Sequence, residues 1–133
     1  FSLCIFVSHI AEHCLNIRHE YMCVAAARAA IDAEGLTAPI LGHVGDGNYH
    51  VLFLVDPNDA AEGAAAKRVY DGMIAHAHRM QGSCTGEHGI GLGKRKQLIA
   101  EFGEDVVDLM RELKRAMDPK GILNPGKIFE LSP

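Results

Sequence analysis

The spacing of apolar and polar residues predicts a helical start followed by a pair of strands. Residues 9–34 are rich in alanine and contain no proline or glycine, which predicts a helix with Gly35 as its C-terminal stop. After this helix, two apolar stretches, Pro39–Val44 and Tyr49–Val55, flank Gly45-Asp46-Gly47-Asn48. An Asp-Gly pair between apolar runs is typical of a β-hairpin turn.

The remainder of the chain is mostly helical in pattern. Asn58 or Asp59 is suited to cap the first of these helices, and residues 82–93 form a loop rich in glycine. The predicted helices are Ala60–Met80, Lys94–Phe102 and Asp105–Met117. Helices combined with an antiparallel hairpin predict the α+β fold class.

Composition and net charge limit the kinds of binding partner and the cellular compartment that we expect for this protein. A formal net charge of −4 over 133 residues argues against nucleic-acid binding through a basic surface. The apolar run Leu3–Val7 is too short to span a bilayer, so no transmembrane segment is expected. The 4 cysteines lack close pairs, which favours reduced thiols and a cytoplasmic location. Because the chain begins with Phe1, it is expected to be processed or a fragment.

Two of the 8 histidines flank the predicted hairpin turn. If Asp46 and Gly47 are the central turn residues, His43 lies directly opposite His50 on one face of the hairpin. Side chains in such a pair have Cβ atoms about 5 Å apart, so both imidazoles can bind one metal ion. The alternative is a pair of histidines that only hydrogen-bond within or beside the sheet.

The glycine-rich loop carries the second group of candidate residues. Its glycines allow the backbone to approach a ligand closely. Glu87 could complete a His/His/Glu set that leaves a coordination position open for substrate. The adjacent His88 could accept a proton from a bound hydroxyl group. The alternative is a solvated surface loop.

Other short motifs carry less weight. Arg95 stands where a phosphate-binding P-loop needs Ser or Thr, and Gly89-Ile90-Gly91 lacks the third glycine of the dinucleotide pattern. The cluster Lys94-Arg95-Lys96 could hold a carboxylate or phosphate, or be solvated. His9-Ile10-Ala11-Glu12-His13 matches a zinc-protease signature on a predicted helix, although such a match also arises by chance.

Three longer motifs occur in one order along the chain. They are Gly42-His43-Val44-Gly45-Asp46-Gly47-Asn48-Tyr49-His50, Cys84-Thr85-Gly86-Glu87-His88-Gly89-Ile90-Gly91 and Asn124-Pro125-Gly126-Lys127. Together they resemble the C-terminal domain of the FAD-linked oxidases of the vanillyl-alcohol oxidase superfamily. Within it, the sequence is most similar to the D-lactate dehydrogenase (cytochrome) and glycolate oxidase group, with D-2-hydroxyglutarate dehydrogenase as a near relative.

The resemblance implies a FAD-dependent dehydrogenase that oxidises a small D-2-hydroxy acid, D-lactate to pyruvate, by hydride transfer to FAD. A cytochrome or a quinone would then accept the electrons. The resemblance also implies roles for six residues: metal ligands His43, His50 and Glu87, with zinc as the metal; catalytic base His88; substrate-side Asn48; and Asn124 near the flavin.

The implied fold is a ferredoxin-like antiparallel sheet covered by helices. Residues 1–26 do not show the strand and amphipathic helix of the family, so we expect a divergent or non-native segment followed by the domain at 27–133. A missing first strand would expose a sheet edge that a second copy could cover, giving a homodimer.

Two further expectations concern activity. The FAD-binding domain of the family is not part of this sequence, so the isolated chain is expected to be inactive. Only the full-length enzyme would lie peripherally at the inner membrane. The alternative function is a non-catalytic α+β module for ligand binding or assembly.

Overall fold

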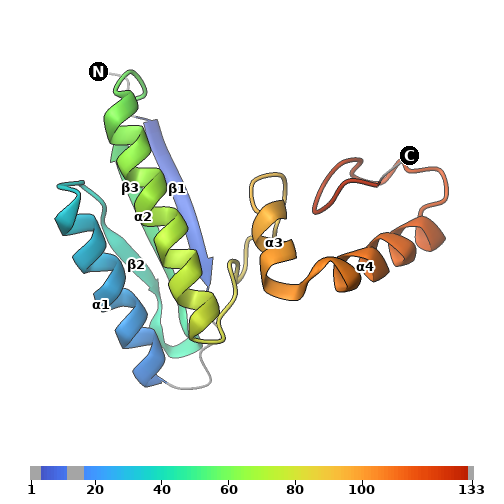
Figure 1. Ribbon diagram of the computed structural model, residues 1–133, viewed down its shortest axis with the longest axis horizontal. Helices are drawn as coiled ribbons and strands as arrows, with labels where there is room; N and C mark the ends of the chain where they lie inside the picture. Colours follow the sequence, from blue (N-terminus) through green and yellow to red (C-terminus); the bar gives the residue numbers. More distant parts are fainter. Residues whose placement is uncertain (1–3, 12–16, 132–133) are drawn as a thin grey trace. The chain divides into compact units, whose positions relative to one another are not determined.

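The computed structural model describes residues 4–11 and 17–131, which divide into two compact units (Figure 1). The first unit extends to Glu87 and the second begins at His88. The first unit contains β1 (Cys4–Ala11), α1 (Ile17–Ala33), β2 (Ile40–His43), a short 3-10 turn η1 (Val44–Asp46), β3 (Asn48–Val55) and α2 (Ala60–Arg79). The second contains α3 (Arg95–Phe102) and α4 (Glu104–Met117).

The first unit is a two-layer α+β structure, which confirms the predicted fold class. Its strands lie in the order β1-β3-β2, and β3 is antiparallel to both neighbours. With α1 between β1 and β2, and α2 after β3, this is the split β-α-β arrangement of ferredoxin-like folds. Both helices cover the same face of the sheet (Figure 1).

The start of the chain differs from the prediction. Cys4–Ala11 is a strand, paired with β3 from Cys4 opposite Val55 to Ala11 opposite Asn48. The predicted helix is therefore wrong at residues 9–11 and confirmed over α1, whereas its residues 12–16 lie outside the described part of the chain. An apolar run of this length fits a strand or a buried helix equally well, and only its pairing with β3 decides between them. The first strand that we expected to be missing is therefore present, and β1 itself lies at the edge of the described sheet. The homodimer stays a prediction.

Both predicted helix boundaries near the sheet are confirmed. Gly35 adopts φ +66°, and the amides of Gly35 and Leu36 donate to Asp32 and Ile31 carbonyls, both at 3.1 Å. This is the glycine-terminated Schellman ending of a helix. Asp59 caps α2, since its Oδ1 accepts from the amides of Ala61 and Glu62 at 2.9 and 3.0 Å.

The hairpin forms, but in a different register. His43 lies opposite Asn48, and Leu41 lies opposite His50, so the direct His43–His50 pairing is wrong. The connection is the longer loop 44–47, in which η1 is followed by Gly47 at φ +70°. Because opposite and alternate residues share a face, this change of register still leaves both histidines on one face.

The core of the first unit lies between the sheet and its helices. Alternate β3 residues Tyr49, Val51, Phe53 and Val55 are buried there. They meet buried positions of α1 and α2 such as Ile31 and Val69. Alternation therefore directs Asn48, His50, Leu52 and Leu54 to the sheet face away from the helices. This second face carries the candidate site.

Candidate metal and substrate site

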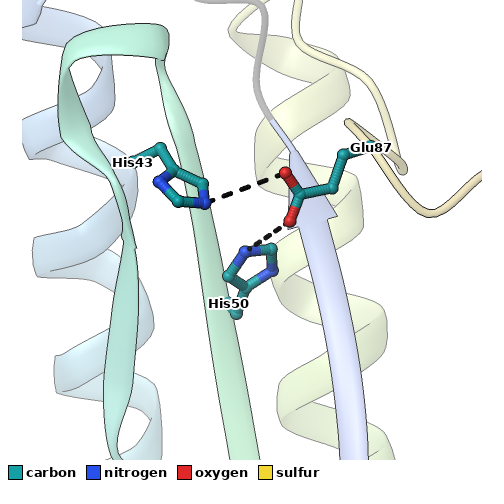
Figure 2. Close-up of side chains that lie close together, drawn as sticks. All are labelled: His43, His50 and Glu87. Carbon is teal, nitrogen blue, oxygen red and sulfur yellow. Dashed lines mark ion pairs between the residues drawn. The ribbon is translucent and has the colours of Figure 1, made fainter.

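Three candidate ligands converge on the face of the sheet away from the helices (Figure 2). His43 ends β2, His50 lies in β3, and Glu87 lies in the loop that follows α2. The Glu87 carboxylate spans the two rings: Oε1 lies 3.1 Å from His50 Nε2, and Oε2 lies 3.8 Å from His43 Nε2. The two ring centroids are 6.1 Å apart and nearly perpendicular.

The spacing of these donor atoms suits one metal ion. Ligand atoms about 2.1 Å from a tetrahedral zinc ion stand about 3.4 Å from one another. One donor atom from each of His43, His50 and Glu87 lies within 4.8 Å of the other two, so small side-chain adjustments would close the set. Two imidazoles and one carboxylate are also a donor set that leaves a position for a substrate oxygen.

Asn48 supplies a further polar atom on this face. It lies directly opposite His43, and the residue is only 8% exposed. Its side-chain oxygen accepts no hydrogen bond from the described part of the chain. A buried acceptor without a donor is costly, so this oxygen is suited to a hydrogen bond from a bound ligand.

Apolar residues of β2 and β3 lie beside His50 on this face, and His9 of β1 lies opposite it. Leu41, which lies opposite His50, is half-exposed, and Leu52 follows His50 on the same face. None of the three strands contains Lys or Arg. The cation that pairs with the carboxylate of a hydroxy acid at this face would therefore be a metal ion or a residue outside the strands.

The two remaining predicted site residues belong to the second unit. His88 follows Glu87 directly in the sequence and is exposed. Asn124 is exposed and adopts a left-handed backbone at φ +46°. The structure thus brings together His43, His50, Glu87 and Asn48, and it describes His88 and Asn124 within a separate unit.

The structure also tests parts of the zinc-protease match and of the basic cluster. His9 lies in β1, so the zinc-protease signature on a helix is wrong, while Glu12 and His13 fall outside the described residues. Within the basic cluster, Arg95 holds a carboxylate of this chain, because its Nη1 donates to Glu130 Oε1 at 2.6 Å. The sequence shows only that Arg95 is one of three basic residues at the start of a predicted helix, and nothing in this pattern indicates Glu130 as its partner.

Comparison with known proteins gives consistent matches. Residues 7–128 match the family described as FAD linked oxidases, C-terminal domain. The chain is 41% identical over 94% of its length to "Probable D-lactate dehydrogenase, mitochondrial" of Danio rerio. It is 45% identical over 77% of its length to "D-lactate dehydrogenase [cytochrome] 1, mitochondrial" of Saccharomyces cerevisiae. It is 42% identical over 64% of its length to "Glycolate oxidase subunit GlcD" of Escherichia coli K12.

These matches cover a small part of each relative: 25% of the Danio rerio protein and 17% of the other two. The family match begins at residue 7, within the segment 1–26 that we expected to be divergent or non-native. It therefore includes β1 from residue 7 onward. Within the described residues, no helix is both long and apolar enough to cross a membrane. On the extent of the family match, the chain belongs to the FAD linked oxidases, as a C-terminal domain of that family.

Proposed function

We propose that this chain is the substrate- and metal-binding part of a FAD-dependent D-2-hydroxy-acid dehydrogenase that oxidises D-lactate to pyruvate. The observation that carries the proposal is the convergence of His43, His50 and Glu87 on an accessible sheet face. The names of the Danio rerio and Saccharomyces cerevisiae relatives support D-lactate as the substrate.

In this proposal, His43, His50 and Glu87 hold a divalent metal ion, zinc, which polarises the oxygens of the hydroxy acid when it is bound. Asn48 contributes its unpartnered side-chain oxygen to the hydroxyl side of the substrate. His88 accepts the hydroxyl proton. A bound FAD would supply the hydride acceptor for the C2 hydrogen, and Asn124 would lie near it. Loss of the hydroxyl proton to His88 and of the C2 hydride to that acceptor would together leave pyruvate.

The apolar side chains beside His50 support a substrate with a small uncharged group. Contact of Leu41 or Leu52 with the methyl group of D-lactate would remove apolar surface from water, which is favourable. A second carboxylate would lose water there and meet no Lys or Arg on the three strands. The electron acceptor is proposed to be a cytochrome, as in the name of the yeast relative.

The compartment is part of the same proposal. The relatives from fish and yeast are named mitochondrial, whereas the cysteine pattern favours a cytoplasmic location. We propose a reducing compartment inside the cell. Fractionation followed by immunodetection of the native protein distinguishes the cytosol from mitochondria.

Zinc binding by the chain alone tests the site. Titration calorimetry should give one zinc per chain. His43→Ala, His50→Ala and Glu87→Gln should each weaken binding at least tenfold, because loss of even an outer partner of a metal ligand usually costs about 10–100-fold in affinity. His76→Ala in α2 removes a histidine elsewhere in the same unit and should leave the affinity unchanged. Absence of zinc binding by the unaltered chain would contradict the site.

Activity requires the flavin. The chain alone should show no turnover, and joining it to the FAD-binding part of a relative should give oxidation of D-lactate in preference to D-2-hydroxyglutarate. His88→Gln in the joined protein should lower kcat by roughly 10²–10⁴, the range expected for loss of a general base. A joined protein that binds FAD and zinc but oxidises neither acid would favour the non-catalytic alternative.

A further inference from the structure

The turn that contains Asn124 is held in place by side chains on both sides. It lies in a tail after α4 that forms neither helix nor strand. Beneath part of the tail is a cavity of about 420 Å³, lined by Arg95, Arg111 and Phe129 among others. Because apolar packing under the tail is incomplete, its position depends on hydrogen bonds.

On the N-terminal side, the turn is held by the end of α4. Asp118 is buried, and its carboxylate accepts from the amides of Ile122 and Leu123 at 3.1 and 2.9 Å. Lys114 donates to Asp118 and to the Leu123 carbonyl, both at 2.6 Å. The residue immediately before Asn124 is therefore fixed through both its amide and its carbonyl.

On the C-terminal side, the turn is held by Arg95 and the glycine-rich loop. One guanidinium nitrogen of Arg95 donates to the Gly126 carbonyl, and the other donates to Glu130. The Ile128 amide donates to the Gly91 carbonyl at 2.8 Å. Ile128 has φ +70°, a left-handed conformation that is strained for a β-branched residue and persists only when its surroundings hold it.

Between these two anchors, Asn124 itself is exposed. Its side chain makes no hydrogen bond within the described residues, while its carbonyl accepts from Lys127 across the turn at 3.2 Å. The backbone of this residue is thus fixed while its amide group remains available. Such preorganisation is what a ligand-binding side chain needs.

We propose that Arg95 is a positioning residue: it ties the Asn124–Lys127 turn to the start of α3 and so to the loop that follows His88. The inference rests on the proposed function, in which Asn124 lies near the flavin. Arginine suits this role because its planar fork reaches a carbonyl and a carboxylate at once, whereas the single ammonium of lysine is a point donor. Arg95 thus fixes the turn that contains Asn124 relative to the loop that follows His88.

The experiment uses the chain itself, without metal or flavin. Amide hydrogen exchange and the ¹H–¹⁵N spectrum are compared for the unaltered chain, Arg95→Ala, Arg95→Lys and Glu130→Gln. Exchange of the Ile128 amide should rise about tenfold in Arg95→Ala, the effect of losing a charged hydrogen bond. Arg95→Lys should rise nearly as much, and Glu130→Gln less, because it retains the contact with Gly126. The side-chain amide signals of Asn124 should shift in the same order.

A matched control separates positioning from charge and from general stability. Lys96→Ala removes the neighbouring positive charge and should leave the Asn124 and Ile128 signals unchanged. Amides of Leu98 and Val107 report whether the buried part of the second unit remains folded. The proposal is overturned if Arg95→Lys retains the exchange rate and Asn124 signals of the unaltered chain, or if Lys96→Ala reproduces the effects of Arg95→Ala.

Failure of the proposed function would be seen in a different measurement. If Asn124→Ala leaves the absorbance spectrum of bound FAD unchanged in the joined protein, Asn124 does not approach the flavin. The hydrogen-exchange result is independent of that outcome, because it is obtained without FAD.

Discussion

The two units of this chain are stabilised in different ways. In the first, Tyr49, Val51 and Phe53 are fully buried between the sheet and its helices. In the second, the buried apolar side chains of the described residues are Leu98 and Val107. Along α4, by contrast, Leu109, Leu113 and Met117 are 60%, 56% and 83% exposed. Apolar packing thus defines the first unit far more than the second.

Polar contacts take the larger role in the second unit. Arg111 is mostly buried and donates to Glu104, Asp108 and the Glu130 carbonyl at 2.6–3.0 Å. Similar contacts from Arg95 and Asp118 hold the tail. The metal-ligand candidates therefore rest on a well-buried apolar core, whereas Asn124 depends on directional hydrogen bonds. The first unit should therefore be sensitive to cavities, and the second to charge and pH.

The largest effect is expected from a cavity in the first unit. Phe53→Ala should lower the free energy of unfolding by about 3–5 kcal/mol, the usual cost of removing a buried aromatic ring. Zinc affinity should fall with it, because Phe53 lies on the same strand as His50. Urea unfolding, followed by circular dichroism, measures the first effect and calorimetry the second.

Leu113→Ala on the exposed face of α4 is the matched comparison. Because this side chain is 56% exposed, we expect the free energy of unfolding to change by no more than about 0.5 kcal/mol. Equal effects of Phe53→Ala and Leu113→Ala would mean that the two units do not differ in packing as described.

A smaller effect, confined to the second unit, is expected from acid. The hydrogen bond from Lys114, together with the amides of Leu123 and Ile122, lowers the pKa of the Asp118 carboxyl. Because this pKa is lowered in the folded state, the ionised carboxylate stabilises the tail at any pH above 3.8, the ordinary pKa of aspartate. The stabilisation is lost as the pH falls below that value and the carboxylate takes up a proton. Protection of the Ile122 and Leu123 amides, measured against the intrinsic exchange rate at each pH, should therefore fall in acid before the first unit unfolds.

Asp118→Asn tests the origin of that pH dependence. The amide cannot ionise, so exchange of the Leu123 amide should already be faster at neutral pH and should show no further step below pH 3.8. A step of unchanged size in Asp118→Asn would assign the acid response to another group.

The smallest effect is expected from a surface ion pair in the first unit. Arg68 donates twice to Glu34, at 2.9 and 2.7 Å, and joins α2 to the end of α1. The hydrogen bond from Arg68 lowers the pKa of the Glu34 carboxyl, but the pair is exposed to solvent and to salt. Glu34→Gln should barely shift the urea midpoint, and the shift should vanish in 1 M salt. A shift comparable to that of Phe53→Ala would contradict the dominance of the core.

The sequence predicts the site better than it predicts the strand pairing around it. The residue types His43, His50 and Glu87 and their motif spacing identify the ligand candidates, and the structure brings all three together. The register was wrong because an Asp-Gly pair fits both a two-residue turn and the end of a longer loop. The positive φ of Gly47 suits either case.

Other features depend on long-range partners that local patterns do not contain. Residues 9–11 fit a helical pattern locally, and their pairing with β3 is what makes them part of a strand. Likewise, Arg95 in a basic cluster resembles a solvated residue until its partner Glu130, 35 positions later, is known. Cap residues such as Asp59 were predictable because their hydrogen bonds are local.

The hairpin loop 44–47 is also where this domain can change in length during evolution. A residue gained or lost within this loop leaves the facing of both histidines unchanged, because the buried face of β3 fixes the strand pairing and the loop takes up the difference. A residue gained within β3 between Asn48 and His50 would instead turn one of these two side chains toward the helices. Natural variants that retain both histidines should therefore differ in length within loop 44–47 and not within the strands.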